Sequence, residues 1–218
     1  MDQPARSILI ADDHPLFRQA LKQSLSLFMA DTRWLEADSA DSLEQQLCAE
    51  ADIDLVLLDL QMPGSHGYST LIHLRSHYPA IPVMVISAHE DGQTVGKAIH
   101  YGAQGFIPKS AQPQQLAEAL QLVLDGELYL PPGMEGLADE EHGEDDIGAR
   151  LAELTPQQYK VLQMFAEGLL NKQIAYELEV SEATIKAHAT AIFKKLGVRN
   201  RTQAVIALQG LDMDNKPV

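Results

Sequence analysis

The stretch DLVLLDLQMPGSHG, residues 54–67, decides the fold because it joins an apolar strand to a carboxylate and a sharp turn. Four consecutive apolar residues, Leu55 to Leu58, are typical of a strand that is covered on both faces of a sheet. Asp59 follows directly, and the pair Pro63-Gly64 predicts a turn just beyond it. An aspartate at a strand end is most often a turn residue or a helix cap, so the role of Asp59 depends on what neighbouring strands bring to the same edge.

Short apolar runs alternate with segments of helical periodicity over the first 124 residues. The predicted strands are residues 7–11, 33–37, 55–59, 82–88 and 105–109, and the predicted helices are residues 15–28, 41–50, 68–79, 92–102 and 113–126. We expect Asp41 or Ser42 to cap the second helix. Five strand–helix units predict an α/β domain, built as a doubly wound, five-stranded parallel sheet with helices on both faces.

The remainder of the chain divides into an acidic segment and a helical region. Residues 126–150 are rich in Pro, Gly and acidic residues, which predicts a solvated linker with a possible short helix at 134–141. Residues 151–211 predict an all-α domain of four helices, followed by a tail at 212–218. Thr155 and Ser181 are the expected N-caps of two of these helices, and Gly168 and Gly197 the expected ends.

Composition limits the classes of function. The formal net charge is −15, of which residues 1–124 and 125–150 each contribute −8 and residues 151–218 contribute +1. Because polyanions repel acidic surfaces, only the last third of the chain is expected to approach nucleic acid. The single cysteine, Cys48, excludes an intrachain disulfide. Since no apolar stretch approaches the ~18 residues of a membrane span and no signal peptide is evident, we expect a cytoplasmic protein without a membrane partner.

Polar residues follow four of the five predicted strands. Asp12 and Asp13 follow the first, Asp59 ends the third, Ser87 ends the fourth, and Lys109 ends the fifth. Because carboxyl ends of parallel strands meet at one edge, we expect these groups to converge there. Carboxylates, a carbonyl and water suit Mg²⁺, a carboxylate can attack phosphorus, and the metal and a lysine neutralise the phosphoryl oxygens. The pattern therefore predicts an aspartyl-phosphate site.

Four segments carry a family resemblance, namely ILIADDHPLFRQAL, LVLLDLQMPGSHG, VMVISAHED and GAQGFIPKS. They strongly resemble the receiver domain of bacterial two-component response regulators over about residues 7–125, which implies a flavodoxin-like receiver at residues 1–125. The resemblance implies Asp59 as the phosphoacceptor, and Asp12, Asp13, Asp59 and the backbone carbonyl of Gln61 as the Mg²⁺ site.

The same resemblance assigns the phosphoryl-binding and switch positions. Lys109 matches the conserved lysine, Ser87 the switch hydroxyl and Phe106 the switch aromatic residue. Ser87 stands where Thr is commoner, which keeps the hydroxyl, and Phe106 stands where Tyr is common, which keeps the ring. Gln61 and His89 match positions that flank the path of attacking water, so we predict that they tune hydrolysis; the alternative is that both are loop residues without kinetic effect.

The C-terminal helices predict a helix-turn-helix, a motif that lays its second helix in the major groove of DNA. The segment LTPQQYKVLQMFAEGLLNKQIAYELEVSEATIKAHATAIFKKLGVRNRTQAV closely resembles the LuxR-type DNA-binding domain, and the whole chain is similar to NarL/FixJ-type response regulators. The candidate DNA-binding positions are Asn171, Lys172, Ser181, Thr184, Lys186, Ala187, His188, Lys195 and Arg201. Gln158, Tyr159 and Lys160 depart from the usual charged residues of the family, and we expect them to affect packing and a surface ion pair.

The resemblance implies a transcription regulator rather than an enzyme, catalysing only its own phosphoryl transfer and dephosphorylation. Its implied partners are a cognate histidine kinase, double-stranded DNA, a second copy of the chain upon activation, and RNA polymerase. One alternative is a phosphatase of the haloacid dehalogenase type, although that chemistry wants a second acid at position 61, where Gln61 stands. Another is a phosphorylation-independent regulator whose receiver binds a ligand or a protein.

A further hypothesis is that acidic residues 139–146 shield the basic recognition surface in the inactive state; the alternative is a simple tether.

Overall fold

The computed structural model describes residues 6–50, 52–134, 136 and 147–211, and its N-terminal part is the predicted parallel sheet. The strands are β1 (Arg6–Ala11), β2 (Thr32–Ala37), β3 (Leu55–Asp59), β4 (Val83–Ser87) and β5 (Gly105–Pro108). They lie in the order β2-β1-β3-β4-β5, and every neighbouring pair is parallel. The strand order therefore reverses between β1 and β3, the place where such sheets bind ligands.

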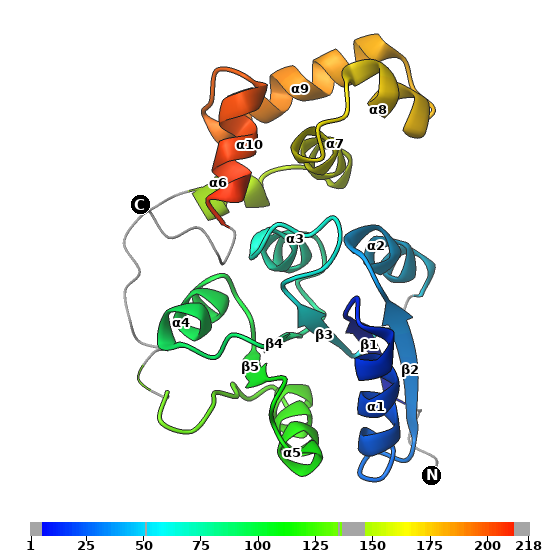
Figure 1. Ribbon diagram of the computed structural model, residues 1–218, viewed down its shortest axis with the longest axis vertical. Coiled ribbons are helices and arrows are strands. Elements are labelled where there is room, and N and C mark those ends of the chain that lie inside the picture. The colour runs from blue at the N-terminus through cyan, green and yellow to red at the C-terminus, as the bar shows by residue number, and fades with distance from the viewer. Residues whose placement is uncertain (1–5, 51, 135, 137–146, 212–218) are drawn as a thin grey trace.

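Helices cover both faces of the sheet, as Figure 1 shows. Helices α1 (Pro15–Leu25) and α5 (Pro113–Leu124) lie on one face, whereas α2 (Ala40–Ala49), α3 (Ser69–His77) and α4 (Gly92–His100) lie on the other. Alternate residues of each strand point into two hydrophobic cores. On β3, Leu55 and Leu57 point into the core under α1 and α5, and Val56 and Leu58 point into the core on the α2–α3–α4 side. Burial on both faces explains why this strand reads as one uninterrupted apolar run.

The start of α2 differs from the prediction. Its N-cap is Ser39, whose hydroxyl accepts a hydrogen bond from the backbone N–H of Ser42. The hydroxyl of Ser42 in turn accepts from the N–H of Ser39, forming a reciprocal capping box. The prediction of Asp41 or Ser42 as the cap was wrong, because the N-cap is Ser39 and Ser42 is the third residue of the helix.

The C-terminal part contains the four predicted helices, α7 (Pro156–Ala166), α8 (Asn171–Glu177), α9 (Glu182–Leu196) and α10 (Arg201–Gln209). Thr155 and Ser181 cap α7 and α9, and Gly197 ends α9 in the left-handed conformation, as predicted. Among the described residues no helix is long and apolar enough to cross a membrane.

Both ends of the predicted linker are structured. A short additional helix, α6 (Ile147–Ala152), begins inside it, and Leu151 is buried in a core shared with the helical domain. Near the other end, Tyr129 extends the sheet edge, because its N–H donates to Gln104 and its carbonyl accepts from Phe106. The predicted helix at 134–141 lies almost entirely outside the described residues, and residues 139–146 and 212–218 lie wholly outside them.

The two domains pack against each other through α3. It lies beside α6 and α7, and one hydrophobic core runs without interruption from the sheet into the helical domain. Backbone bonds join them too: the N–H of Tyr68 donates to the carbonyl of Leu211 at 3.2 Å. The helical domain is therefore docked on the α2–α3–α4 side of the sheet (Figure 1).

The turn between α8 and α9 contains a strained residue. Glu179 has φ of 52°, the one positive φ found outside glycine among the described residues. Left-handed backbone costs a non-glycine residue about 1–2 kcal/mol. A glycine at this position removes that cost, but part of the gain is lost because unfolded glycine has the greater conformational entropy. Glu179→Gly should therefore raise the free energy of unfolding by about 0.5–1 kcal/mol in chemical denaturation. The control Ala187→Gly, inside α9, should lower it by about 1 kcal/mol; a loss of stability in Glu179→Gly would contradict the assignment of strain.

Candidate functional site

The carboxyl edge of the sheet gathers the polar residues that the sequence predicted there. The register sets Asp59 beside Ile86 on β4, and Ser87 beside Pro108 on β5. Asp12 follows β1 directly, and its N–H donates to the carbonyl of Ala37 at the end of β2. The ends of these strands thus converge at the β1–β3 switch point of the sheet.

Lys109 joins the two buried carboxylates of this edge. Its Nζ lies 2.6 Å from Oδ2 of Asp12 and 2.8 Å from Oδ2 of Asp59. Asp12 is 0% exposed and Asp59 is 2% exposed. The Lys109 ammonium also lies 5.0 Å from the centre of the Phe17 ring on α1. One cation therefore compensates two carboxylates, and the pocket keeps a negative charge.

Burial and charge shift the ionisation of this pair. Burial raises the pKa of Asp59, and the nearby charge of Asp12 adds to the rise, against the opposing effects of Lys109 and of the Gln61 N–H. Burial also opposes the charge on Lys109, but its bonds to both aspartates outweigh burial and raise the Lys109 pKa above its usual value. The lysine is thus held as a cation beside a carboxylate whose ionised form is poorly solvated.

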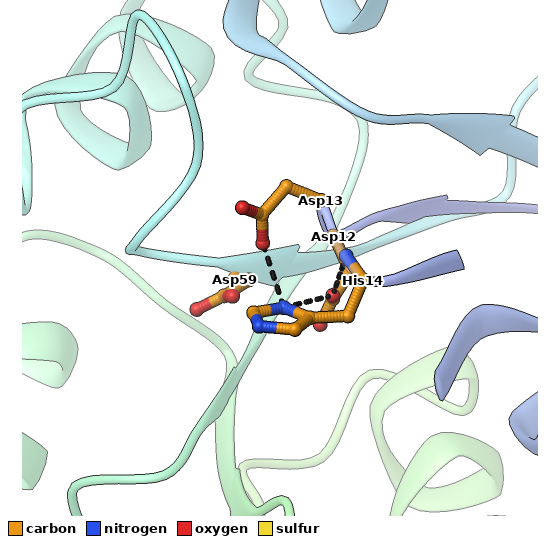
Figure 2. Close-up of side chains that lie close together, drawn as sticks. All are labelled: Asp12, Asp13, His14 and Asp59. Atoms are coloured by element: carbon orange, nitrogen blue, oxygen red, sulfur yellow. Dashed lines mark hydrogen bonds and ion pairs between the residues drawn. The ribbon is translucent and has the colours of Figure 1, made fainter. Parts of the chain in front are cut away.

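The donor set fits a divalent cation. One ligand atom from each of Asp12, Asp13, His14 and Asp59 lies within 4.8 Å of the others. With three carboxylates and one lysine, these groups leave an excess of negative charge that a divalent cation would compensate. Figure 2 shows the carboxylates grouped around the His14 ring, whose Nδ1 lies 2.7 Å from Asp13 Oδ1. His14 was not among the residues predicted for this site.

The switch and hydrolysis positions lie around the same pocket. Ser87 is buried and its hydroxyl accepts a hydrogen bond from the backbone N–H of His89 at 3.0 Å. Phe106 is fully buried in the core on the α2–α3–α4 side. The side chains of Gln61 and His89 are exposed, and the Gln61 N–H donates to Asp59 Oδ1 at 3.1 Å. Ser87, Gln61 and His89 thus lie at or next to the site, whereas the ring of Phe106 is directed into the core.

The predicted DNA-binding residues divide into exposed and engaged side chains. On α9, Lys186 and Ala187 are exposed, while Thr184 and His188 are half-buried. Ser181 is exposed but its hydroxyl caps the helix. On α8, Lys172 is exposed and Asn171 half-buried. The face of α9 formed by Thr184, Lys186, Ala187 and His188 therefore stays open while the domains are docked.

Two of the predicted DNA-binding residues, Lys195 and Arg201, are hydrogen-bonded within the helical domain. Lys195 Nζ donates to the carbonyl of Glu153 at 2.7 Å and to Oε1 of Gln158 at 2.8 Å. Arg201 donates to the carbonyl of Phe165 at 2.9 Å and stacks over its ring. Gln158 thus accepts a charge-assisted hydrogen bond through its neutral amide oxygen, where the sequence departed from the usual charged residue. These bonds hold both cations against the helical domain, and each cation keeps N–H donors that the bonds do not use.

Sequence reasoning missed a set of domain-docking residues on α7. The Tyr159 hydroxyl lies 2.9 Å from Ser69 Oγ and 3.4 Å from Thr70 Oγ1, and its ring stacks on that of His73 at 4.4 Å. Burial raises the pKa of Tyr159 to about 12, so the hydroxyl keeps its proton. The one available signal was that Tyr159 departs from the charged residues usual at this position.

A second docking contact reaches the loop that follows Asp59. Gln163 Nε2 donates to the carbonyl of Gly64 at 2.5 Å, and Gln163 is only 7% exposed. Lys160 lies 3.2 Å from Asp41 on α2, in a more exposed ion pair. The Asp59 loop is therefore bonded directly to the helical domain.

Comparisons with known proteins agree on both parts of the chain. Residues 8–121 match the response regulator receiver domain, and residues 152–208 match the bacterial regulatory proteins of the luxR family. The chain is 42% identical over 211 residues to the glycerol metabolism activator of Pseudomonas putida, covering 94% of this chain and 96% of that protein. It is 32% identical over 211 residues to the nitrate/nitrite response regulator protein NarL of Escherichia coli K12, covering 94% and 95%. A solved structure of two RcsB dimers bound to two parallel DNAs aligns with a TM-score of 0.56 and 26% identity, covering 94% and 97%.

Because burial and Asp12 both disfavour ionised Asp59, its charge should cost folding energy when no cation is added. Asp59→Asn should raise the free energy of unfolding by on the order of 1 kcal/mol in chelator-treated protein at pH 7, measured by denaturant titration. Asp91→Asn is the matched control, because a hydrogen bond from Thr94 lowers the pKa of Asp91 and its charge is favoured by folding. The interpretation fails if Asp59→Asn is the less stable of the two variants.

Proposed function

Because this chain belongs to the response regulators that join a receiver domain to a LuxR-type DNA-binding domain, we propose that phosphorylation of Asp59 controls its binding to DNA. The protein is a regulator of transcription. A histidine kinase is the expected phosphodonor, RNA polymerase the expected partner in transcription, and the cytoplasm the expected compartment. The observation on which the proposal rests is the bridge from Lys109 to both Asp12 and Asp59 at the β1–β3 switch point.

The chemistry assigned to Asp59 is nucleophilic attack on phosphorus, in which a carboxylate oxygen forms the new O–P bond as the P–N bond to the histidine of the kinase breaks. Its Oδ1 accepts one backbone N–H, and its Oδ2 faces Lys109. Lys109 orients the carboxylate and then offers positive charge to the phosphoryl oxygens. The hydroxyl of Ser87, on the neighbouring strand, is suited to bond one of those oxygens once the group is attached. Lys109 therefore acts both before and after transfer, whereas Ser87 acts only after it.

Mg²⁺ is the proposed cofactor. Asp12, Asp13, Asp59 and the carbonyl of Gln61 are the residues that would hold it, with charge neutralisation of the phosphoryl oxygens as its contribution. The fit rests on the close approach of the three carboxylates. For hydrolysis, the exposed side chains of Gln61 and His89 are proposed to set the lifetime of the phosphoryl group through access of water.

The output proposed for the helical domain is sequence-specific binding to double-stranded DNA. The exposed face of α9 is suited to the major groove, and Lys172 and Asn171 on α8 to the phosphates. The domain carries 8 Lys and Arg against 7 Asp and Glu in residues 151–218, a net charge of only +1. One copy should therefore bind weakly, and a homodimer gains avidity from two half-sites. RcsB, a structural relative, binds DNA as dimers.

We assign the link between phosphorylation and output to the docked interface. The loop after Asp59 bonds Gln163, and the start of α3 bonds Tyr159. Leu211, at the end of α10, is bonded to Tyr68, so docking holds α10 beside the receiver. We propose that residues 202–208 of α10 pair two copies of the chain, and Ile206 within them is 59% exposed. Phosphorylation, acting with the shift of Ser87 and Phe106, is proposed to favour the undocked population and free α10 to pair.

Phosphorylation of Asp59 is testable with acetyl phosphate and Mg²⁺. Mass spectrometry should find one phosphoryl group on the wild type and none on Asp59→Asn. With DNA fragments selected from a genomic pool by the treated wild type, affinity should rise at least tenfold on phosphorylation and stay unchanged for Asp59→Asn. If both proteins bind the fragments equally, treated or not, the receiver is a binding module that does not need phosphorylation.

The docked interface is testable by removing its two buried polar contacts. Tyr159→Phe keeps the stacking on His73 but loses the hydroxyl bonds, and Gln163→Ala loses the bond to Gly64. A net loss of about 1 kcal/mol in each variant should shift the docking equilibrium about fivefold, seen as a larger radius of gyration in solution scattering. DNA affinity before phosphorylation should rise with it.

Gln157→Ala is the matched control for these variants, because Gln157 is exposed on the same helix. Reciprocity requires that phosphorylation of the wild type also enlarge the radius of gyration, since the two equilibria are linked. If the Tyr159 and Gln163 variants undock but phosphorylated wild type stays compact, the interface is structural and does not transmit the signal.

A further inference from the structure

The His14 ring folds back over the acidic site while most of its surface stays exposed to solvent (Figure 2). Its backbone N–H donates to Asp12 Oδ1 at 2.8 Å, and its Nδ1 lies 3.2 Å from that same oxygen and 2.7 Å from Asp13 Oδ1 (Figure 2). His14 is the N-cap residue of α1, yet its side chain makes no capping bond to the helix. The imidazole is therefore committed to the carboxylates rather than to α1.

Nδ1 of His14 lies close enough to the carboxylate oxygens for all of them to bind one ion. The four ligand atoms from Asp12, Asp13, His14 and Asp59 all lie within 4.8 Å of one another. Atoms bound to one ion at about 2.1 Å can be at most about 4.2 Å apart, so an inward movement of about 0.6 Å or less would close the shell. A neutral imidazole with its proton on Nε2 would present the Nδ1 lone pair to such an ion.

The remaining atoms of the pocket leave this set available. Lys109 uses Oδ2 of both Asp12 and Asp59, whereas each of their Oδ1 atoms accepts one backbone N–H and keeps a second lone pair for a cation. The side chain of His14 is 66% exposed, which lets the ring either approach a cation or swing into solvent. The histidine is thus the most exposed member of the donor set, and the one that can move most freely.

Metal ions differ in their affinity for an imidazole nitrogen. Mg²⁺ favours carboxylate, carbonyl and water oxygens, whereas first-row transition cations accept imidazole readily. We propose that His14 is a nitrogen ligand that lets the Asp12–Asp13–Asp59 site hold a borderline divalent cation of the Co²⁺ or Zn²⁺ class, while Mg²⁺ displaces the ring into solvent. The inference rests on the proposed phosphoacceptor site and adds a determinant of its metal selectivity.

The test measures metal binding by the full-length protein, with Co²⁺ and Mg²⁺ as the probes. Calorimetric titrations should show that His14→Ala lowers Co²⁺ affinity at least tenfold but leaves Mg²⁺ affinity equal or higher, because the displaced ring no longer competes. The visible absorption of bound Co²⁺ should change when the nitrogen ligand is lost. His14→Asn, which keeps a donor for the carboxylates, should behave like His14→Ala.

Two controls make the outcome decisive. Asp13→Asn should weaken both metals, because it removes an oxygen ligand common to both, and His66→Ala should leave the ratio of the two affinities unchanged. Parallel changes of Co²⁺ and Mg²⁺ affinity in the His14 variants, or an unchanged Co²⁺ spectrum, would overturn the proposal. Failure of the wild type to accept a phosphoryl group with Mg²⁺ would instead overturn the proposed function, so the two failures are distinguishable.

Discussion

The bond from Lys109 to both Asp12 and Asp59 is the interaction on which the rest of the site depends. Two buried carboxylates at adjacent strand ends repel each other, and burial alone disfavours both charges. Lys109 reaches them from β5, two strands away from β3, with its ammonium above the Phe17 ring. Because one lysine cannot balance three acids, the pocket keeps the negative charge that suits it to a divalent cation and so to phosphoryl chemistry.

The same segment that presents Asp59 also supports the helical domain. Gly64, in the loop that follows β3, accepts a bond from Gln163, and α3 begins with the Ser69 hydroxyl that meets Tyr159. Asp59 therefore lies only a few residues along the chain from the contacts of the docked interface, so a change of its charge occurs close to them. One hydrophobic core runs across this interface, so the docked arrangement is a packed state. A local change of charge can shift the equilibrium between such a packed state and the undocked one.

Much of the fold and pocket followed from sequence because their signals are local. The unbroken apolar run of β3, the alternation of strands and helices, and the polar residue at each strand end together predicted where Asp59 and Lys109 would meet. One error was also local, because Ser39 and Ser42 form the capping box of α2 only three residues apart. The others arose where a distant partner decides: Leu151 of α6 is buried in the shared core, and Lys195 is bonded to Gln158.

By itself, the sequence determined the parallel sheet, the composition of the acidic pocket and the division into a receiver and a helix-turn-helix domain, because periodicity and strand-end residues are properties of neighbours along the chain. Only the tertiary structure decided which α7 residues dock on α3, which cations are already bonded, and where the His14 ring lies. Those outcomes depend on side-chain contacts between segments as much as 90 residues apart, as for Ser69 and Tyr159, and no local pattern encodes such a contact.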